Sequence, residues 1–205
     1  MPAHLPLFVL TTWLLAMLPG AGHALMLRQT LEGGLHIARV TIVGNATGLL
    51  LWSLSAAAGL SALLSARPGV YVVVRIAGGV VLCVLGINTF RARRGRPQPP
   101  GAAAAPGRRW GAFGAGLATN LGNPKAGVFA VSVLPQFVTT HGPVFASSAL
   151  LGVVWAGVNA CWYLLFTWGV SRGRSLVTRP AVQRALRLVT GLVLVLLGVA
   201  VAAGY

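Results

Sequence analysis

The sequence has almost no negative charge. Glu32 is its one acidic residue, against 16 Lys and Arg, and Asp is absent. A carboxylate pair for glycosidic acid–base chemistry, a complete Ser-His-Asp triad and a carboxylate cage for Mg²⁺ or Ca²⁺ are therefore excluded. Cys83 and Cys161 form no C-x-x-C pair, and the four histidines show no metal-ligand spacing. We expect no metal site, no cofactor and no enzymatic activity.

Charge of either sign is also scarce. Charged residues make up 8% of the chain and hydrophobic residues 56%, whereas a soluble domain carries about a quarter charged residues. This balance is typical of an integral membrane protein. The net charge of +15 could instead indicate nucleic-acid binding, but the arginines are confined to short segments between long apolar runs. We therefore expect the lipid bilayer, and no nucleic acid, as a partner.

Six apolar runs are long enough to cross a membrane, since about 20 helical residues span a hydrocarbon core of about 30 Å. They predict an all-α integral membrane protein with six transmembrane helices. The runs cover residues 5–27, 40–64, 70–90, 110–138, 144–170 and 185–205. The first run could alternatively be a secretory signal peptide, because residues 21–24 loosely resemble a cleavage site. No Lys or Arg precedes Leu5, so we expect the run to remain as the first helix.

The basic residues gather in alternate connections between these runs. Thirteen of the 16 lie in or beside the first, third and fifth connections, which share one side if all six helices span. The positive-inside rule makes that side cytoplasmic, so we expect a multi-pass inner-membrane protein with both termini outside. The third connection, residues 91–109, is rich in Pro, Gly, Ala and Arg and is typical of a flexible linker.

The basic linker divides a single transmembrane domain into two halves of three helices, about residues 1–90 and 110–205. An offset of 105 residues places Pro19 on Pro124, so each half has a helix-breaking proline in its first helix. Because three spans is an odd number, the second half would be inverted relative to the first. Inverted repeats with broken helices in matching positions are typical of transporters that bind their substrate near the membrane midplane.

Lys125 is the most informative polar residue. It lies near the middle of the fourth run, where a lysine costs about 2.5–3.5 kcal/mol and usually faces a cavity or a partner. Pro124 removes a backbone donor, and the freed carbonyl groups could bind a substrate. Asn120 and Asn123 would share a helical face if the helix continues there. Gln136 is a further polar residue of the same run.

The first helix supplies a second group of candidates. Pro19 and Gly20 interrupt it, either as a packing kink or as an unwound segment that binds substrate. His23 follows three residues later, either as a hydrogen-bonding partner of another helix or as a proton carrier. The polar residues of the fourth run also have structural explanations, because Lys125 could snorkel to an interface and asparagines commonly join helices by hydrogen bonds.

Glycines spaced four apart predict close helix packing in the second run, at Gly44 and Gly48, where Asn45 could line a cavity. Glycines in the third and sixth runs, among them Gly79 and Gly198, predict packing of the same kind. The candidate substrate-binding residues are Pro19, Gly20, His23, Asn45, Asn120, Asn123, Pro124, Lys125 and Gln136.

The stretch 120–137, NLGNPKAGVFAVSVLPQF, resembles the signature of the lysine exporter (LysE/RhtB) family of small amino-acid efflux proteins. Members carry an N-L-x-N-P-K-A run followed by P-Q-F, and the likeness extends over nearly the whole chain. The first helix departs from the family pattern of P-G-P followed by an acidic or amide residue. Here Pro19-Gly20 is followed by Ala21, Gly22 and His23.

The resemblance implies proton-driven export of an amino acid or a similar metabolite, by alternating access around a midplane site. A cationic substrate side chain would normally need a buried carboxylate, which no apolar run provides, so a neutral amino acid is more compatible. Its carboxylate would pair with Lys125, and its ammonium group would meet carbonyls freed near Pro19 and Pro124. His23 or Lys125 would carry the proton. Export of a metal ion or another small metabolite, a scaffold that transports nothing, and assembly as a homodimer remain open alternatives.

Overall fold

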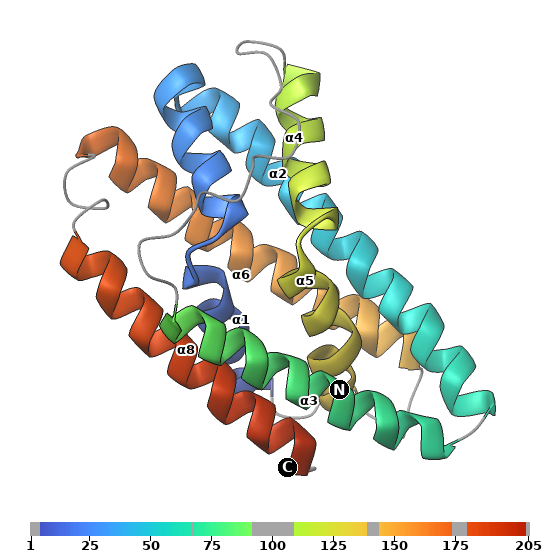
Figure 1. Cartoon of the computed structure of the whole chain (residues 1–205). Coiled ribbons are helices and arrows are strands. Elements are labelled where there is room, and N and C mark those ends of the chain that lie inside the picture. The colour runs from blue at the N-terminus through green and yellow to red at the C-terminus, as the bar shows by residue number, and fades with distance from the viewer. Residues whose placement is uncertain (1–4, 67, 92–108, 139–143, 174–179, 204–205) are drawn as a thin grey trace.

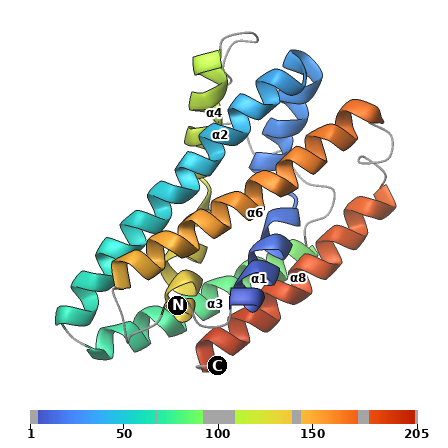
Figure 2. The same ribbon diagram turned by 180° about the vertical axis from the view of Figure 1, so that it is seen from behind.

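Helices account for all the regular structure that the computed structural model describes (Figures 1 and 2). The structure describes residues 5–66, 68–91, 109–138, 144–173 and 180–203. The elements are α1 (Leu5–Met17), α2 (Ala21–Ala66), α3 (Pro68–Arg91), α4 (Arg109–Leu121), α5 (Pro124–Val128), the π-helical turn η1 (Phe129–Val133), the 3₁₀ turn η2 (Leu134–Phe137), α6 (Val144–Arg172) and α8 (Pro180–Ala203). By length and composition alone, Phe145–Arg172 and Ala21–Gly59 are able to cross a membrane, although the second stretch contains the turn at Gly34.

Prolines set several helix ends. Helix α1 ends at Met17, because Leu18 precedes Pro19 and a residue before proline is disfavoured in the helical region. Three other helices begin with a proline, whose fixed φ suits the first helical position and whose missing amide hydrogen is not needed there. They are α3, α5 and α8, which begin at Pro68, Pro124 and Pro180.

The chain reverses within α2, at Gly34. Its backbone there has φ 72° and ψ 178°, a conformation that glycine adopts far more readily than other residues. In Figure 1 the first part of α2 rises and the second part runs back down across the molecule. Met26 and Ile42, each eight residues from Gly34, pack in one cluster with Tyr163. The first connection, expected between residues 27 and 40, is thus one turn between two helical segments.

The two broken helices run in opposite directions. In Figure 1, α1 and the first part of α2 rise, whereas α4 and α5 descend, and Figure 2 shows the same relation from behind. The Gly34 turn, the start of α4 and the end of α6 lie towards the upper part of Figure 1. The end of α2 and the starts of α3 and α6 lie at the opposite, lower right end. Most of the expected basic linker, residues 92–108, lies outside the described residues.

Glycine faces bring helix backbones into contact, as their spacing predicted. A Cβ atom on Gly44 of α2 would overlap the carbonyl oxygen of Phe113 in α4. Cβ atoms on Gly79 of α3 and Gly198 of α8 would each lie 2.6 Å from the carbonyl oxygen of the other glycine. Small residues are what permits backbones to approach this closely in a membrane bundle.

An aromatic core holds α1 against the second half of the chain. Phe8 is fully buried, with its ring centroid 6.2 Å from that of Phe129 and 5.1 Å from that of Phe137. Phe129 packs in turn on Trp155 of α6, with centroids 4.7 Å apart. Buried aromatic rings contribute large contact areas, so this core fixes where the ends of the two broken helices lie.

Candidate functional site

The two helix breaks face each other. One comprises Leu18–Gly20, between α1 and α2, and the other comprises Gly122 and Asn123, between α4 and α5. A Cβ atom on Gly20 would lie 2.7 Å from Nζ of Lys125. The amine that follows the second break therefore reaches the backbone of the first break, where the absence of a side chain at position 20 makes room for it.

Asn123 closes the second break with its side chain. Its Oδ1 accepts a hydrogen bond from the Lys125 amide at 3.2 Å, and its carbonyl oxygen accepts from Ala126 at 3.0 Å. These are the contacts of a helix N-cap, which satisfies amides that lack a partner in the first turn. The sequence predicted that Asn120 and Asn123 would share a helical face if the helix continued. The α4 helix ends at Leu121, so the two residues do not lie on one continuous face.

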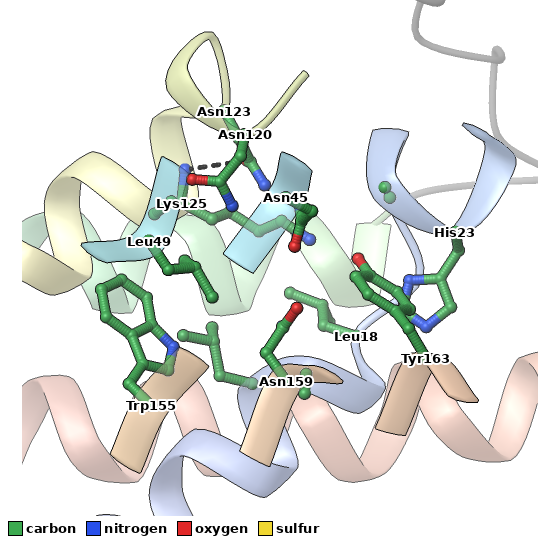
Figure 3. A pocket seen from close by; sticks show the side chains of 15 residues that line it. Leu18, His23, Asn45, Leu49, Asn120, Asn123, Lys125, Trp155, Asn159 and Tyr163 are labelled. Atoms are coloured by element: carbon green, nitrogen blue, oxygen red, sulfur yellow. Dashed lines mark hydrogen bonds between the residues drawn. The ribbon is translucent and has the colours of Figure 1, made fainter. Parts of the chain in front are cut away.

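A small cavity lies where the breaks meet (Figure 3). Its volume is about 30 Å³, close to the share of liquid volume that one water occupies. Its polar lining residues are His23, Asn45, Asn120, Asn123, Lys125, Asn159 and Tyr163, and its apolar ones include Leu18, Leu49 and Trp155. The lining thus combines one lysine with uncharged polar groups from α2, α4, α6 and the α4–α5 break, and it holds no carboxylate.

Two asparagine side chains in this lining carry buried oxygen atoms without a partner. Asn45 of α2 and Asn120 of α4 are each 3% exposed, and the Oδ1 atom of each is buried and makes no hydrogen bond. A buried polar atom in this state costs about 1–3 kcal/mol. The residues that line the cavity therefore include an amine donor and two asparagines whose side-chain oxygens are not used within the protein.

His23 sits in an aromatic cluster at the other side of the cavity. Nε1 of Trp162 donates a hydrogen bond to Nε2 of His23 at 2.9 Å. Because an indole N–H can only donate, Nε2 of His23 carries no proton in this arrangement. The histidine ring meets Tyr163 and Phe166 edge-on, at centroid distances of 5.2 and 5.0 Å. Contacts with three residues of α6 therefore fix the position of the His23 ring.

The structure gathers six of the nine candidate residues around the cavity. They are Gly20, His23, Asn45, Asn120, Asn123 and Lys125. Pro19 lies in the first break and Pro124 begins α5, and neither is part of the cavity lining. Gln136 lies in η2, where its Nε2 donates to the carbonyl oxygen of Ser132 at 3.2 Å, also away from the lining.

Residues of α6 that we did not predict complete the site. Trp155, Asn159 and Tyr163 line the cavity. They are spaced four apart, so they share one face of α6, and this spacing is the sequence signal that could have identified them. Gly22 belongs with them, because a Cβ atom there would overlap the hydroxyl group of Tyr163.

A second pocket also borders the α4–α5 break. It has a volume of about 640 Å³, and its lining is mainly apolar, with Trp52 and Val81 among the contributing residues. Asn123 lines both pockets. Within the described ranges, no group of three or more His, Cys, Asp or Glu could hold a metal ion.

Comparison with known proteins identifies the family to which this chain belongs. A family model described as LysE type translocator matches residues 13–204. The chain therefore belongs to the LysE type translocator family, as the stretch 120–137 indicated, and it is a membrane transporter and not an enzyme.

Relatives of similar length are found in several bacteria. The uncharacterised membrane protein YrhP of Bacillus subtilis is 25% identical over 91% of this chain and 92% of its own length. A homoserine/homoserine lactone efflux protein of Salmonella typhi is 27% identical over 93% of this chain and 92% of its own length. A threonine efflux protein of Escherichia coli is 28% identical over 62% of this chain and 66% of its own length. No solved structure matches the chain.

Proposed function

We propose that this chain exports a neutral amino acid across the inner membrane, with Lys125 binding the carboxylate of the substrate. The observation that carries the proposal is the Lys125 amine, which reaches between the two helix breaks into a cavity whose lining has no acidic residue. An amine in such a place is free to pair with an incoming anion. The efflux proteins related to this chain are named for homoserine, homoserine lactone and threonine, all of which have uncharged side chains.

The distribution of acidic residues favours a neutral side chain on the substrate. Glu32, the one acid of the chain, accepts a bifurcated hydrogen bond from Nε of Arg28, at 3.0 Å to Oε1 and 2.9 Å to Oε2. It is exposed, lies near the Gly34 turn and does not line the cavity. A lysine or arginine side chain brought into the cavity would therefore find no carboxylate, and a desolvated charge without a partner is strongly unfavourable.

Transport in this proposal proceeds by alternating access. A cavity of about 30 Å³ holds about one water, so an amino acid enters only when the helices around the breaks separate. The opposite directions of the two broken helices agree with two inverted repeats of three spans, residues 1–90 and 110–205. Rocking of these halves would open the cavity to one side of the membrane and then to the other. Both termini would lie outside, with the basic linker in the cytoplasm.

The driving force in this proposal is the proton gradient. His23 and Lys125 are the titratable side chains that we expect to take part, since both line the cavity. For His23 to bind a second proton at Nε2, its hydrogen bond from Trp162 would have to break. Protonation of His23 would thus be coupled to loss of a contact between α2 and α6, which is the kind of coupling that alternating access requires.

Uptake into everted membrane vesicles tests the proposal. Vesicles with an acidic interior should accumulate L-threonine or L-homoserine, and a protonophore should abolish the accumulation. Replacement of Lys125 by Met keeps the length of the side chain and removes its charge, so it should reduce amino-acid uptake at least about tenfold, the effect of losing one charged pair. Homoserine lactone has no carboxylate, so its uptake should depend much less on Lys125.

The variant Lys125→Arg is the matched control, because it retains the positive charge, and it should keep part of the activity. Unchanged uptake of L-threonine and L-homoserine by Lys125→Met would refute the role of this residue. Absence of accumulation of any neutral amino acid by the wild-type protein would refute the proposed function itself.

A further inference from the structure

We propose that Asn45 and Asn120 bind the ammonium group of the substrate, so that the site selects substrates with a free primary ammonium group. This inference rests on the proposed export function, and it adds how the positive end of a substrate is recognised by a protein with one acidic residue. The two side chains come from helices of different halves, α2 and α4, and both line the cavity that the Lys125 side chain enters (Figure 3).

Several carbonyl groups at the breaks already accept hydrogen bonds. The sequence suggested that the ammonium group would meet carbonyls freed by the two prolines. Instead, Gly20 O accepts from Ala24 at 3.1 Å, and Asn123 O accepts from Ala126 at 3.0 Å. Asn120 O accepts from the Asn123 amide at 3.0 Å and from Nε1 of Trp52 at 3.4 Å. The irregular backbone around the cavity therefore satisfies much of its own hydrogen bonding.

The side-chain oxygens of Asn45 and Asn120 are different, because they are buried and have no partner. Native proteins satisfy nearly all buried polar atoms, so two unsatisfied acceptors in the lining of one cavity require an explanation. A ligand with several N–H donors provides it. A primary ammonium group has three such donors and no acceptor.

Close packing of α2 and α4 holds the two asparagines in place. A Cβ atom on Gly48 would lie 2.8 Å from both Cβ and Oδ1 of Asn120, and one on Gly116 would lie 2.9 Å from the backbone nitrogen of Asn45. Each asparagine is thus packed against a glycine of the facing helix. The Gly48 contact limits how far the Asn120 side chain can turn, and the Gly116 contact fixes the backbone from which the Asn45 side chain extends, so both residues are held at the cavity before the ligand arrives.

The substrate that fits this arrangement carries opposite charges close together. In an α-amino acid the carboxylate and the ammonium group are attached to the same carbon, so both would fall within one small site. Lys125 would bind the carboxylate, and the neutral oxygens of Asn45 and Asn120 would bind the ammonium. A hydroxy acid would leave these oxygens poorly satisfied, since a hydroxyl group has one donor in place of three.

Competition for uptake into everted vesicles tests the inference. Unlabelled L-homoserine is compared with its 2-hydroxy analogue, in which a hydroxyl group replaces the amino group, as competitors of labelled L-homoserine. The wild-type protein should favour the amino acid by at least about tenfold, as expected for a charge-assisted hydrogen bond. Asn45→Leu and Asn120→Leu remove the oxygens at similar size, and each should reduce this preference to about threefold or less.

A matched control is available next to the site. Thr119 also has a buried Oγ1 atom without a partner, but it does not line the cavity. Thr119→Val should therefore keep the preference for the amino acid. If the leucine variants do not fold, Asn45→Asp and Asn120→Asp replace them, and their carboxylates should raise the preference.

The outcomes separate the two proposals. Wild-type vesicles that accumulate neither L-threonine nor L-homoserine would overturn the export function. Wild-type uptake together with an unchanged preference in both leucine variants, or a lower preference in both aspartate variants, would overturn only the assignment of the ammonium site.

Discussion

The break between α4 and α5 is closed by its own residues, whereas the break between α1 and α2 is surrounded by residues distant in the chain. At the second break, Asn123 caps the Lys125 amide with its side chain, and Pro124 opens the next helix. In the first break and the first turn of α2 that follows it, the nearest atoms to the missing side chains of Gly20 and Gly22 belong to Lys125 and to Tyr163. The two breaks therefore depend on different interactions.

This difference shows two ways to interrupt a helix in a membrane. A capped break is specified locally, since the Asn-Pro pair both ends one helix and begins the next. A glycine break depends on tertiary contacts, since it leaves space that another helix must fill. Changes at the two breaks should therefore have different consequences for stability and for transport.

The largest effect on stability is expected from Gly22→Ala. The new Cβ atom would overlap the Tyr163 hydroxyl and lie 3.1 Å from its Cζ atom. Tyr163 is 6% exposed and packs against His23, so its ring cannot move freely. Overpacking of this kind should lower the free energy of unfolding by about 1–3 kcal/mol. Thermal unfolding of the purified protein, followed by tryptophan fluorescence, measures the change.

Two further variants make this test specific. Tyr163→Phe removes the overlapping hydroxyl group, so it should recover part of the stability when it is combined with Gly22→Ala. A Cβ atom on Gly157 of α6 would meet no neighbouring atom within 4 Å, so Gly157→Ala should not destabilise. If Gly22→Ala and Gly157→Ala unfolded at equal temperatures, the contact between Gly22 and Tyr163 would not be what stabilises the chain beside the first break.

An intermediate effect is expected from Asn123→Ala at the capped break. Loss of an N-cap side chain costs about 0.5–2 kcal/mol, typically about 1, and here the Lys125 amide would lose its bond to Oδ1. Asn123→Asp and Asn123→Ser can still accept this bond and should retain most of the stability in the same thermal assay. If serine proved no better than alanine, local capping would not explain how the second break is held.

The smallest effect on stability is expected from Gly20→Ala, which should instead alter transport. Its Cβ atom would meet Nζ of Lys125 at 2.7 Å and Cε at 3.4 Å. These atoms are the flexible end of a long side chain, so the free energy of unfolding should change by less than about 0.5 kcal/mol. Displacement of the amine should raise the KM of amino-acid uptake about fivefold, equivalent to about 1 kcal/mol. An unchanged KM would separate Gly20 from the substrate site.

The second break and its lysine could be predicted because their causes are local. Proline lacks an amide hydrogen, and a lysine in an apolar run must face something polar. Lys125 and Asn120 consequently line the cavity, as expected. Gln136 is also a polar residue of the same apolar run, so the sequence offered the same reason to place it at the site. Its side chain instead donates to the carbonyl oxygen of Ser132, one turn earlier, and does not line the cavity.

The contribution of α6 could not be foreseen from sequence reasoning about single polar residues. Tyr163 and Trp162 lie about 140 residues from the segment they contact, and nothing local indicates that they meet Gly22 and His23. Their positions follow from the packing of α6 beside α2. Met26 and Ile42 of α2 and Tyr163 of α6 form one buried cluster at this contact.

By itself, the sequence determined the membrane class, the places where helices end and the residue that carries the charge of the site. These follow from transfer free energies and from backbone chemistry, which act within a few residues. Only the tertiary structure decided which polar atoms share the cavity, that Asn45 and Asn120 keep unpaired oxygens there, and that His23 accepts its hydrogen bond from Trp162. Those outcomes depend on how each helix is rotated against its neighbours, and the close contacts at Gly44, Gly48 and Gly116 set that rotation between α2 and α4.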